Sequence, residues 1–212
     1  MKTLKITIVL LLIIFTLSGC SAMLAAMFGV KPVKEFSVAD YQSFLSKIPE
    51  EIEYISIIST EEQFKNVIKQ GIDSIQKHAL SQPVQILYFR QNHLVSFHAN
   101  CYARGGFGGL DWNTDNRFSV FIPRSAVTYD ISNILLDNYS TIFPEISLKN
   151  ENYYTIIIFW TNLIRRISFS AIETVIENAA QFNKLANCRI YLINTDKFYA
   201  YLANRKSSPK TE

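Results

Sequence analysis

Residues 153–160, YYTIIIFW, and residues 189–193, RIYLI, are two almost uninterrupted apolar runs, and they decide the fold of this chain. Runs of this kind are typical of strands that are buried on both faces of a sheet. Between them, apolar side chains recur at spacings of three, four and seven, which predicts an amphipathic helix over 171–183. Ser170 and Glu173 form a capping box that opens this helix. Strand, helix and strand joined by short links predict a right-handed βαβ unit near the C-terminus.

The segments before this unit predict a β-hairpin and several helices. Val84–Arg90 and His93–Cys101 are rich in β-branched and aromatic residues, and Gln91-Asn92 is a plausible connection between them. Apolar spacing and capping residues predict helices over 38–47, 61–70, 72–80 and 130–138, and further strands over 53–58 and 118–122. The glycine-rich residues 104–109 are expected to form a flexible loop. A hairpin combined with a βαβ unit indicates an α+β protein, with a single mixed sheet and helices packed on it.

The βαβ stretch, residues 153–196, resembles part of the thioredoxin superfamily. Thr155-Ile-Ile-Ile-Phe-Trp160 is similar to that family's first central strand, and Ile190-Tyr-Leu-Ile-Asn-Thr-Asp196 is similar to its next one. Ile164 and Ile167 stand near the positions of the two redox cysteines, and neither can do thiol chemistry. The hairpin that the family places after its second strand has no room in the 16 residues after Asp196. The resemblance therefore implies a redox-inactive, truncated or rearranged relative, and the alternative is an ordinary βαβ unit.

The N-terminus carries a basic start, a short apolar run and the tetrapeptide Leu17-Ser18-Gly19-Cys20. The run Ile6–Leu17 has the length of a signal-peptide core and is too short for a confident membrane span. The tetrapeptide resembles the lipobox of bacterial lipoproteins. That resemblance implies cleavage before Cys20, acylation of its side chain with palmitate or a similar fatty acid, and permanent tethering, because two acyl chains hold a protein stably.

This resemblance predicts the domain organisation and the location of the mature protein. We expect a signal peptide over 1–19, a tether over 20–36, one α+β domain over 37–203 and a polar tail over 204–212. Ser21 stands where an aspartate would signal retention in the inner membrane. The resemblance therefore implies a bacterial cell-envelope location, on the outer membrane and facing the periplasm.

Charge and composition narrow the range of partners. The chain holds 21 Lys and Arg against 18 Asp and Glu, and the signal peptide would remove two of the lysines, which leaves a mature net charge of +1. The basic residues are scattered along the sequence, so it gives no support for nucleic-acid binding. No cofactor motif and no metal-ligand spacing is present, so neither a cofactor nor a metal is expected. The expected partners are the membrane, through the acyl chains, and an envelope protein or small ligand.

After acylation of Cys20, two cysteines remain, Cys101 and Cys188. An oxidising compartment permits a disulfide between them, and sequence alone cannot show whether they come within reach. The alternative is two small buried apolar residues.

Residues 98–117 are the candidate recognition loop, because polar and aromatic groups are concentrated there around flexible glycines. Its candidate residues are His98, Arg104, Asp111, Trp112 and Arg117. A rigid hairpin that carries such a loop is a common way to build a recognition site, and a solvated loop is the alternative.

No catalytic motif is evident, and the catalytic residues stay unknown. We expect a tethered, non-catalytic binding or interaction module. The alternatives are a hydrolase-like envelope enzyme that uses the 98–117 loop, and a thiol protein that uses Cys101 and Cys188.

Overall fold

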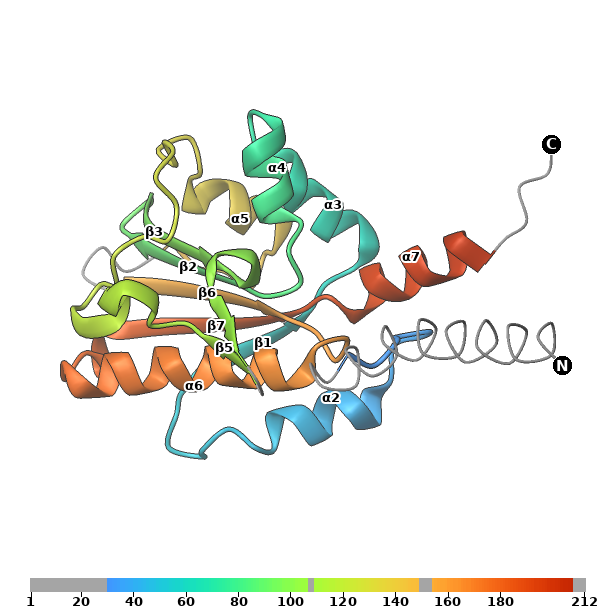
Figure 1. The fold of residues 1–212 in the computed structure, drawn as a ribbon, viewed down its shortest axis with the longest axis horizontal. Coiled ribbons are helices and arrows are strands. Elements are labelled where there is room, and N and C mark those ends of the chain that lie inside the picture. Colours follow the sequence, from blue (N-terminus) through green and yellow to red (C-terminus); the bar gives the residue numbers. More distant parts are fainter. Residues whose placement is uncertain (1–29, 107–108, 149–153, 208–212) are drawn as a thin grey trace, which may run out of the picture.

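The computed structural model describes residues 30–106, 109–148 and 154–207 (Figure 1). Its centre is a five-stranded mixed sheet with the order β1-β7-β6-β2-β3. The strands are β1 (Tyr54–Ile58), β2 (Gln85–Arg90), β3 (His93–Ala99), β6 (Tyr154–Trp160) and β7 (Cys188–Asn194). Strands β1, β7 and β6 are parallel, and the hairpin β2–β3 pairs antiparallel to β6. The predicted α+β class, with one mixed sheet covered by helices, is confirmed.

Strand β6 lies in the middle of this sheet, and six of its seven residues are buried. The helix α6 (Arg165–Gln181) connects it to β7, as the predicted βαβ unit requires. The prediction that Ser170 caps this helix is wrong, because α6 begins earlier, at Arg165. Ser168, in its first turn, donates to the carbonyl oxygen of Thr161 (2.8 Å) and accepts from the Thr161 N–H (3.1 Å). These bonds tie the helix start to the end of β6.

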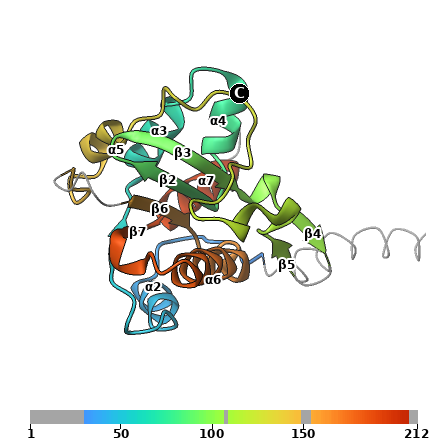
Figure 2. The ribbon, with the colours of Figure 1, turned by 90° about the vertical axis from the view of Figure 1, so that its left-hand side faces the viewer.

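Helices cover both faces of the sheet, as Figure 2 shows. One face carries α3 (Glu61–Lys69), α4 (Ser74–Leu80), α5 (Leu136–Ile142) and α7 (Asp196–Ser207), and the other carries α2 (Val38–Leu45) and α6. Under α2, the ring of Phe44 stacks on Trp160 with 3.8 Å between centroids. On the other face, the ring of Phe64 lies 4.9 Å from that of Phe198. Burial of these aromatic side chains supplies a large share of the apolar area that stabilises the fold.

Helices α2 and α3 begin where the sequence predicts, and α4 begins two residues later than predicted. Thr60 and Gln63 form a reciprocal capping box at α3, and the Ser37 hydroxyl accepts from the Asp40 N–H at α2. Asp73 caps α4 through the Gln76 N–H. Each cap satisfies a backbone donor that the first helical turn leaves open.

Two predicted elements are wrong, and in both cases contacts with distant residues override local preference. In place of a strand over 118–122, the structure has a 3-10 helix over Thr114–Ser119, followed by chain tied to α6 through Asn178, which donates to the Phe118 and Val120 carbonyls. In place of a helix over 130–138, α5 begins at Leu136. The carbonyl of Ile134 accepts a hydrogen bond from the Leu94 N–H of β3. The chain just before α5 therefore bonds to the edge strand of the sheet and does not form a helix.

The described residues of the glycine-rich segment form two short strands. Residues Arg104–Gly106 form β4 and Gly109–Asp111 form β5, which pair antiparallel as a small separate ribbon. Helix α7 continues past residue 203 into the predicted polar tail, as far as Ser207.

Candidate functional site

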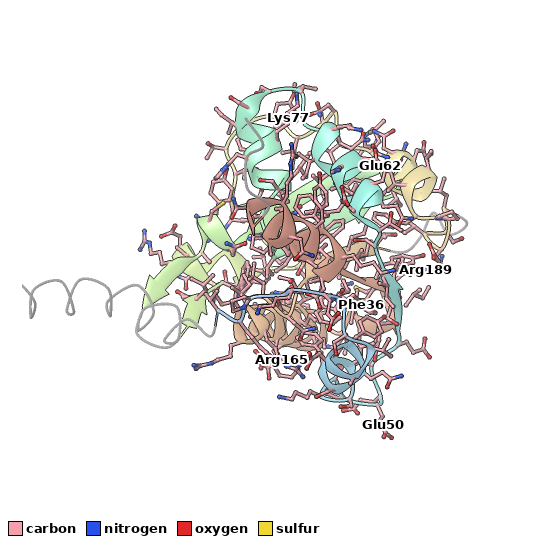
Figure 3. The ribbon with its side chains drawn as sticks, turned by 90° about the vertical axis from the view of Figure 1, so that its right-hand side faces the viewer. Phe36, Glu50, Glu62, Lys77, Arg165 and Arg189 are labelled. Atoms are coloured by element: carbon pink, nitrogen blue, oxygen red, sulfur yellow. The ribbon has the colours of Figure 1, made fainter. Side chains whose placement is uncertain are left out.

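The three parallel strands β1, β7 and β6 end at the same edge of the sheet, and α6 and α7 begin there. Figure 3 looks onto this end of the molecule. In open α/β sheets, ligands bind in the crevice outside the carboxyl ends of parallel strands. A cleft of about 510 Å³ lies at this edge, and we call it the edge cleft. It is lined by Lys31, Pro32, Val33, Lys34, Glu35, Ser37, Asp40, Asn162, Arg165, Arg166 and Asp196.

Asp196 organises the floor of the edge cleft. Only 1% of this residue is exposed, and its carboxylate accepts three hydrogen bonds. One oxygen accepts from the Thr161 hydroxyl (2.6 Å) and the Asn162 N–H (2.7 Å), and the other accepts from the Asn162 side-chain amide (2.7 Å). Because Asp196 follows β7 and the other two residues follow β6, the network joins the ends of adjacent strands. Hydrogen bonds of this kind offset the cost of burying a carboxylate.

Arg165 extends this network to α2. Its Nη1 donates to the Asn162 Oδ1 (3.0 Å) and to the Asp40 carbonyl (3.3 Å), and its Nη2 donates to the Ser43 hydroxyl (3.1 Å). The guanidinium also lies over the ring of Phe44, 5.5 Å from the centroid. A planar group with fixed partners is well suited to orient a site.

The described part of the expected tether packs on the domain and forms one wall of the edge cleft. The Lys31 N–H donates to the Leu163 carbonyl (2.8 Å), and Val30 forms a bridge with Ile164. Val33 is buried. The chain therefore crosses the carboxyl ends of the strands before α2 begins.

Electrostatics at the edge cleft favour an anion. Lys31, Lys34, Arg165 and Arg166 line it, and α6 starts there without a side-chain cap, so its first backbone N–H groups add partial positive charge. The opposing acids are Glu35, Asp40 and the buried, hydrogen-bonded Asp196.

His98 and Trp112 of the predicted recognition loop lie in the core. His98 is 1% exposed, its Nε2 lies 3.0 Å from the Ser96 hydroxyl, and its ring packs 4.7 Å from that of Phe118. Burial, with a smaller contribution from Arg117, lowers the pKa of His98 to about 3, so it is neutral at physiological pH. Trp112 is 3% exposed. Both side chains are therefore largely covered by the protein itself.

The three charged candidates stay near the surface and contact their own neighbours. Arg104 and Arg117 both pair with Asp115, at 3.2 and 3.3 Å, and Arg117 also donates to the Tyr102 carbonyl. Asp111 is exposed and accepts from the Asn113 N–H, which makes a local turn. Asp111 and Trp112 also line a smaller hollow of about 230 Å³ against α6. The five candidates thus do not converge on one site.

The structure does not bring Cys101 and Cys188 together, and both are free thiols. Cys101 follows the end of β3, whereas Cys188 begins β7 at the opposite end of the sheet. Partial desolvation raises the pKa of Cys101, although the residue is exposed, and burial raises that of Cys188 to about 12, so neither is an activated thiolate. The disulfide considered from the sequence therefore needs a different fold.

The acylation site Cys20 and the signal peptide lie outside the described residues. Within residues 30–106, 109–148 and 154–207, none of the helices has the length and apolar character needed to cross a bilayer. Across the same ranges, no three His, Cys, Asp or Glu side chains gather in a way that could hold a metal ion.

The residues that build the edge cleft were visible in the sequence only in part. Asp196 and the pair Arg165-Arg166 stand just after the two apolar runs, and polar residues that follow parallel strands are a known signal. Thr161 and Asn162 carry the same signal, and none of these five residues was predicted as a site from the sequence. Comparison of the chain with protein-family models, curated proteins and solved structures gives no match.

Proposed function

We propose that this protein is a lipid-anchored bacterial envelope protein, on the outer membrane and facing the periplasm, that works as a binding or interaction module. Its binding site is the edge cleft. The acylated residue is Cys20, on the motif Leu17-Ser18-Gly19-Cys20.

The observation that carries the binding role is the hydrogen-bonded network under the edge cleft. Asp196, Thr161, Asn162 and Arg165 hold one another across two strands and two helices. A concave surface whose polar groups are fixed in advance loses little entropy when a ligand binds. The four basic side chains favour an anionic small molecule or an acidic segment of an envelope protein.

No specific observation favours either alternative, the hydrolase-like enzyme or the thiol protein. The enzyme alternative used the 98–117 loop, whose single histidine is neutral and buried. The thiol alternative used Cys101 and Cys188, which stand at opposite ends of the sheet.

We further propose that the fold is a rearranged relative of the thioredoxin superfamily. Two features support this: the βαβ unit forms the middle of the sheet, and an antiparallel hairpin flanks β6. Here β2 and β3 supply that hairpin from before the βαβ unit, so no hairpin is needed after β7.

The anchoring is tested by Cys20→Ala, with Cys101→Ala as the matched control. We expect Cys20→Ala to abolish acylation, seen as the loss of fatty-acid mass, and to leave an unprocessed chain in living bacteria. Cys101→Ala should be processed and should float with membranes like the wild type. Unchanged processing and flotation of Cys20→Ala would refute the anchor.

The binding site is tested by a melting-temperature screen of anionic, neutral and cationic envelope compounds. A ligand at about 100 times its Kd adds about 2.7 kcal/mol of stability, which such a screen detects. The stabilisation should vanish in Lys34→Glu/Arg166→Glu and persist in Lys47→Glu/Lys184→Glu, whose lysines follow the far ends of α2 and α6. Equal stabilisation of both variants would place the ligand elsewhere.

A further inference from the structure

Six basic side chains from distant parts of the sequence gather at the end of the molecule that holds the edge cleft. They come from the segment before α2, the first turn of α6, and α7, which runs outward from the same end (Figure 1). They are Lys31, Lys34, Arg165, Arg166, Lys197 and Arg205. All except Arg165, which is partly buried, are exposed.

Three acidic residues at this end, Glu35, Asp40 and Asp196, offset only part of that charge. Glu35 is exposed, and the Asp40 carboxylate lies 4.0 Å from the Lys31 ammonium group. Asp196 is buried and accepts three hydrogen bonds. Glu61 and Glu62, which open α3, each pair with a lysine of the same helix. The end is therefore net basic.

Apolar side chains are exposed beside these basic groups. Val30 is 37% exposed and Val38, the first residue of α2, is 58% exposed. A surface that mixes basic groups with exposed apolar ones suits the interface of a bilayer. Glu50, Glu51 and Glu53 lie at the opposite end, in the connection between α2 and β1.

The chain enters the domain at this same end, ten residues after the proposed anchor. Ten residues span at most about 35 Å. Anchoring at Cys20 therefore keeps the basic end within about 35 Å of the lipid headgroups.

We propose that this basic end docks on a bilayer of anionic phospholipids, so that the edge cleft opens toward the headgroup layer. The inference rests on the proposed anchoring at Cys20. Each Lys or Arg near an anionic surface strengthens attraction by a factor of about five, and the attraction fades beyond a Debye length. The excess of six basic groups over three acidic ones at this end fixes the orientation of a domain that the acyl chains alone would leave free to tumble.

The test uses the acylated full-length lipoprotein, purified and reconstituted into vesicles. One set of vesicles is rich in phosphatidylglycerol and the other is phosphatidylcholine alone. Lysines are acetylated with a water-soluble reagent and their rates are read by mass spectrometry. We expect Lys34 and Lys197 to react several times more slowly on the anionic vesicles, whereas Lys77, on the outer face of α4, reacts equally on both. Salt of about 1 M, where the Debye length is about 3 Å, should remove the protection.

A charge-neutralised variant tests the cause. Arg166→Gln/Arg205→Gln should lose most of the protection of Lys34 and Lys197, and the control Lys47→Gln/Lys184→Gln should keep it. Melting temperatures close to that of the wild type confirm that both variants fold.

The outcomes separate the two proposals. A protein that does not float with either kind of vesicle refutes the anchor. A protein that floats with both, with equal lysine rates on both, refutes the docking and leaves the anchor standing. If inorganic phosphate without vesicles protects Lys34 and Lys197 as strongly as the anionic vesicles do, a soluble anion accounts for the whole protection and the docking is overturned.

Discussion

The edge cleft and the 98–117 region both concentrate polar side chains, but they are built in opposite ways. At the edge cleft, Asp196 and Asn162 come from the ends of two adjacent strands and are held by each other. In the 98–117 region, Arg104 and Arg117 contact Asp115 of the same segment. The contacts of the edge cleft form only when two strands pair in the sheet, whereas those of Asp115 form within one segment of the chain. A cluster of polar residues in a sequence therefore indicates a site only when distant elements hold it.

The largest loss of stability should come from Asp196→Ala. If this variant is as stable as the wild type, the contrast between the edge cleft and the 98–117 region fails. The change leaves the Thr161 hydroxyl and two donors of Asn162 without their acceptor in a buried place. Each unsatisfied donor costs at least about 1 kcal/mol, so we expect a loss of about 3 kcal/mol, measured by urea unfolding. Asp111→Ala, at an exposed turn, should cost less than about 0.5 kcal/mol.

The second prediction is that stability depends on pH through His98. This residue belongs to the 98–117 region but is buried in the core, so it tests the other side of the comparison. His98 has a folded pKa of about 3 and an unfolded pKa of about 6.5, so the unfolded chain binds more protons between these values. Stability should therefore fall as pH drops through this window, by about 2 kcal/mol between pH 7 and pH 5. Urea unfolding across pH should show this slope in the wild type and in His93→Gln, whose side chain is exposed, and a flatter one in His98→Gln. Equal slopes in all three proteins would mean that His98 is not buried as a neutral ring.

The third effect compares two arginines that differ in how they are held. Arg165→Ala removes hydrogen bonds to Asn162 and Ser43, so we expect a loss of about 1.5 kcal/mol. The matched change Arg104→Ala removes a solvent-exposed ion pair, and it should cost less than about 0.5 kcal/mol. The loss of stability in each variant is measured from its midpoint of urea unfolding. Equal losses in the two variants would contradict the distinction between the two regions.

The smallest effect concerns the two thiols. It is a difference in the rate at which a thiol reagent modifies Cys101 and Cys188, with no substitution and no change in protein stability. Cys101 is exposed, whereas burial raises the pKa of Cys188 to about 12. We expect a thiol reagent to modify Cys101 first and Cys188 slowly. Mild oxidation should leave both thiols titratable in the monomer, and a disulfide between them would contradict the fold.

Segments with a strong local pattern were predicted well, whereas segments that depend on contacts between distant residues were not. Residues 154–160 and 189–193 lie in strands of the central sheet, as their nearly continuous apolar runs favour. The capping box at Thr60 and Gln63 opens α3 as predicted, because both partners are local. The predicted helix over 130–138 is wrong because Ile134 pairs with Leu94, forty residues away in sequence, and no local signal reports that pairing.

The sequence by itself determined the hairpin, the succession of strand, helix and strand in the βαβ unit, and the caps of α2 and α3. It also carries the lipobox motif, on which the proposed anchoring depends. Only the tertiary structure decided which polar residues meet, because hydrogen bonds such as that between Thr161 and Asp196 join positions 35 residues apart. It also turned scattered lysines and arginines into one basic end, because charge accumulates over space, whereas the sequence shows only its order along the chain.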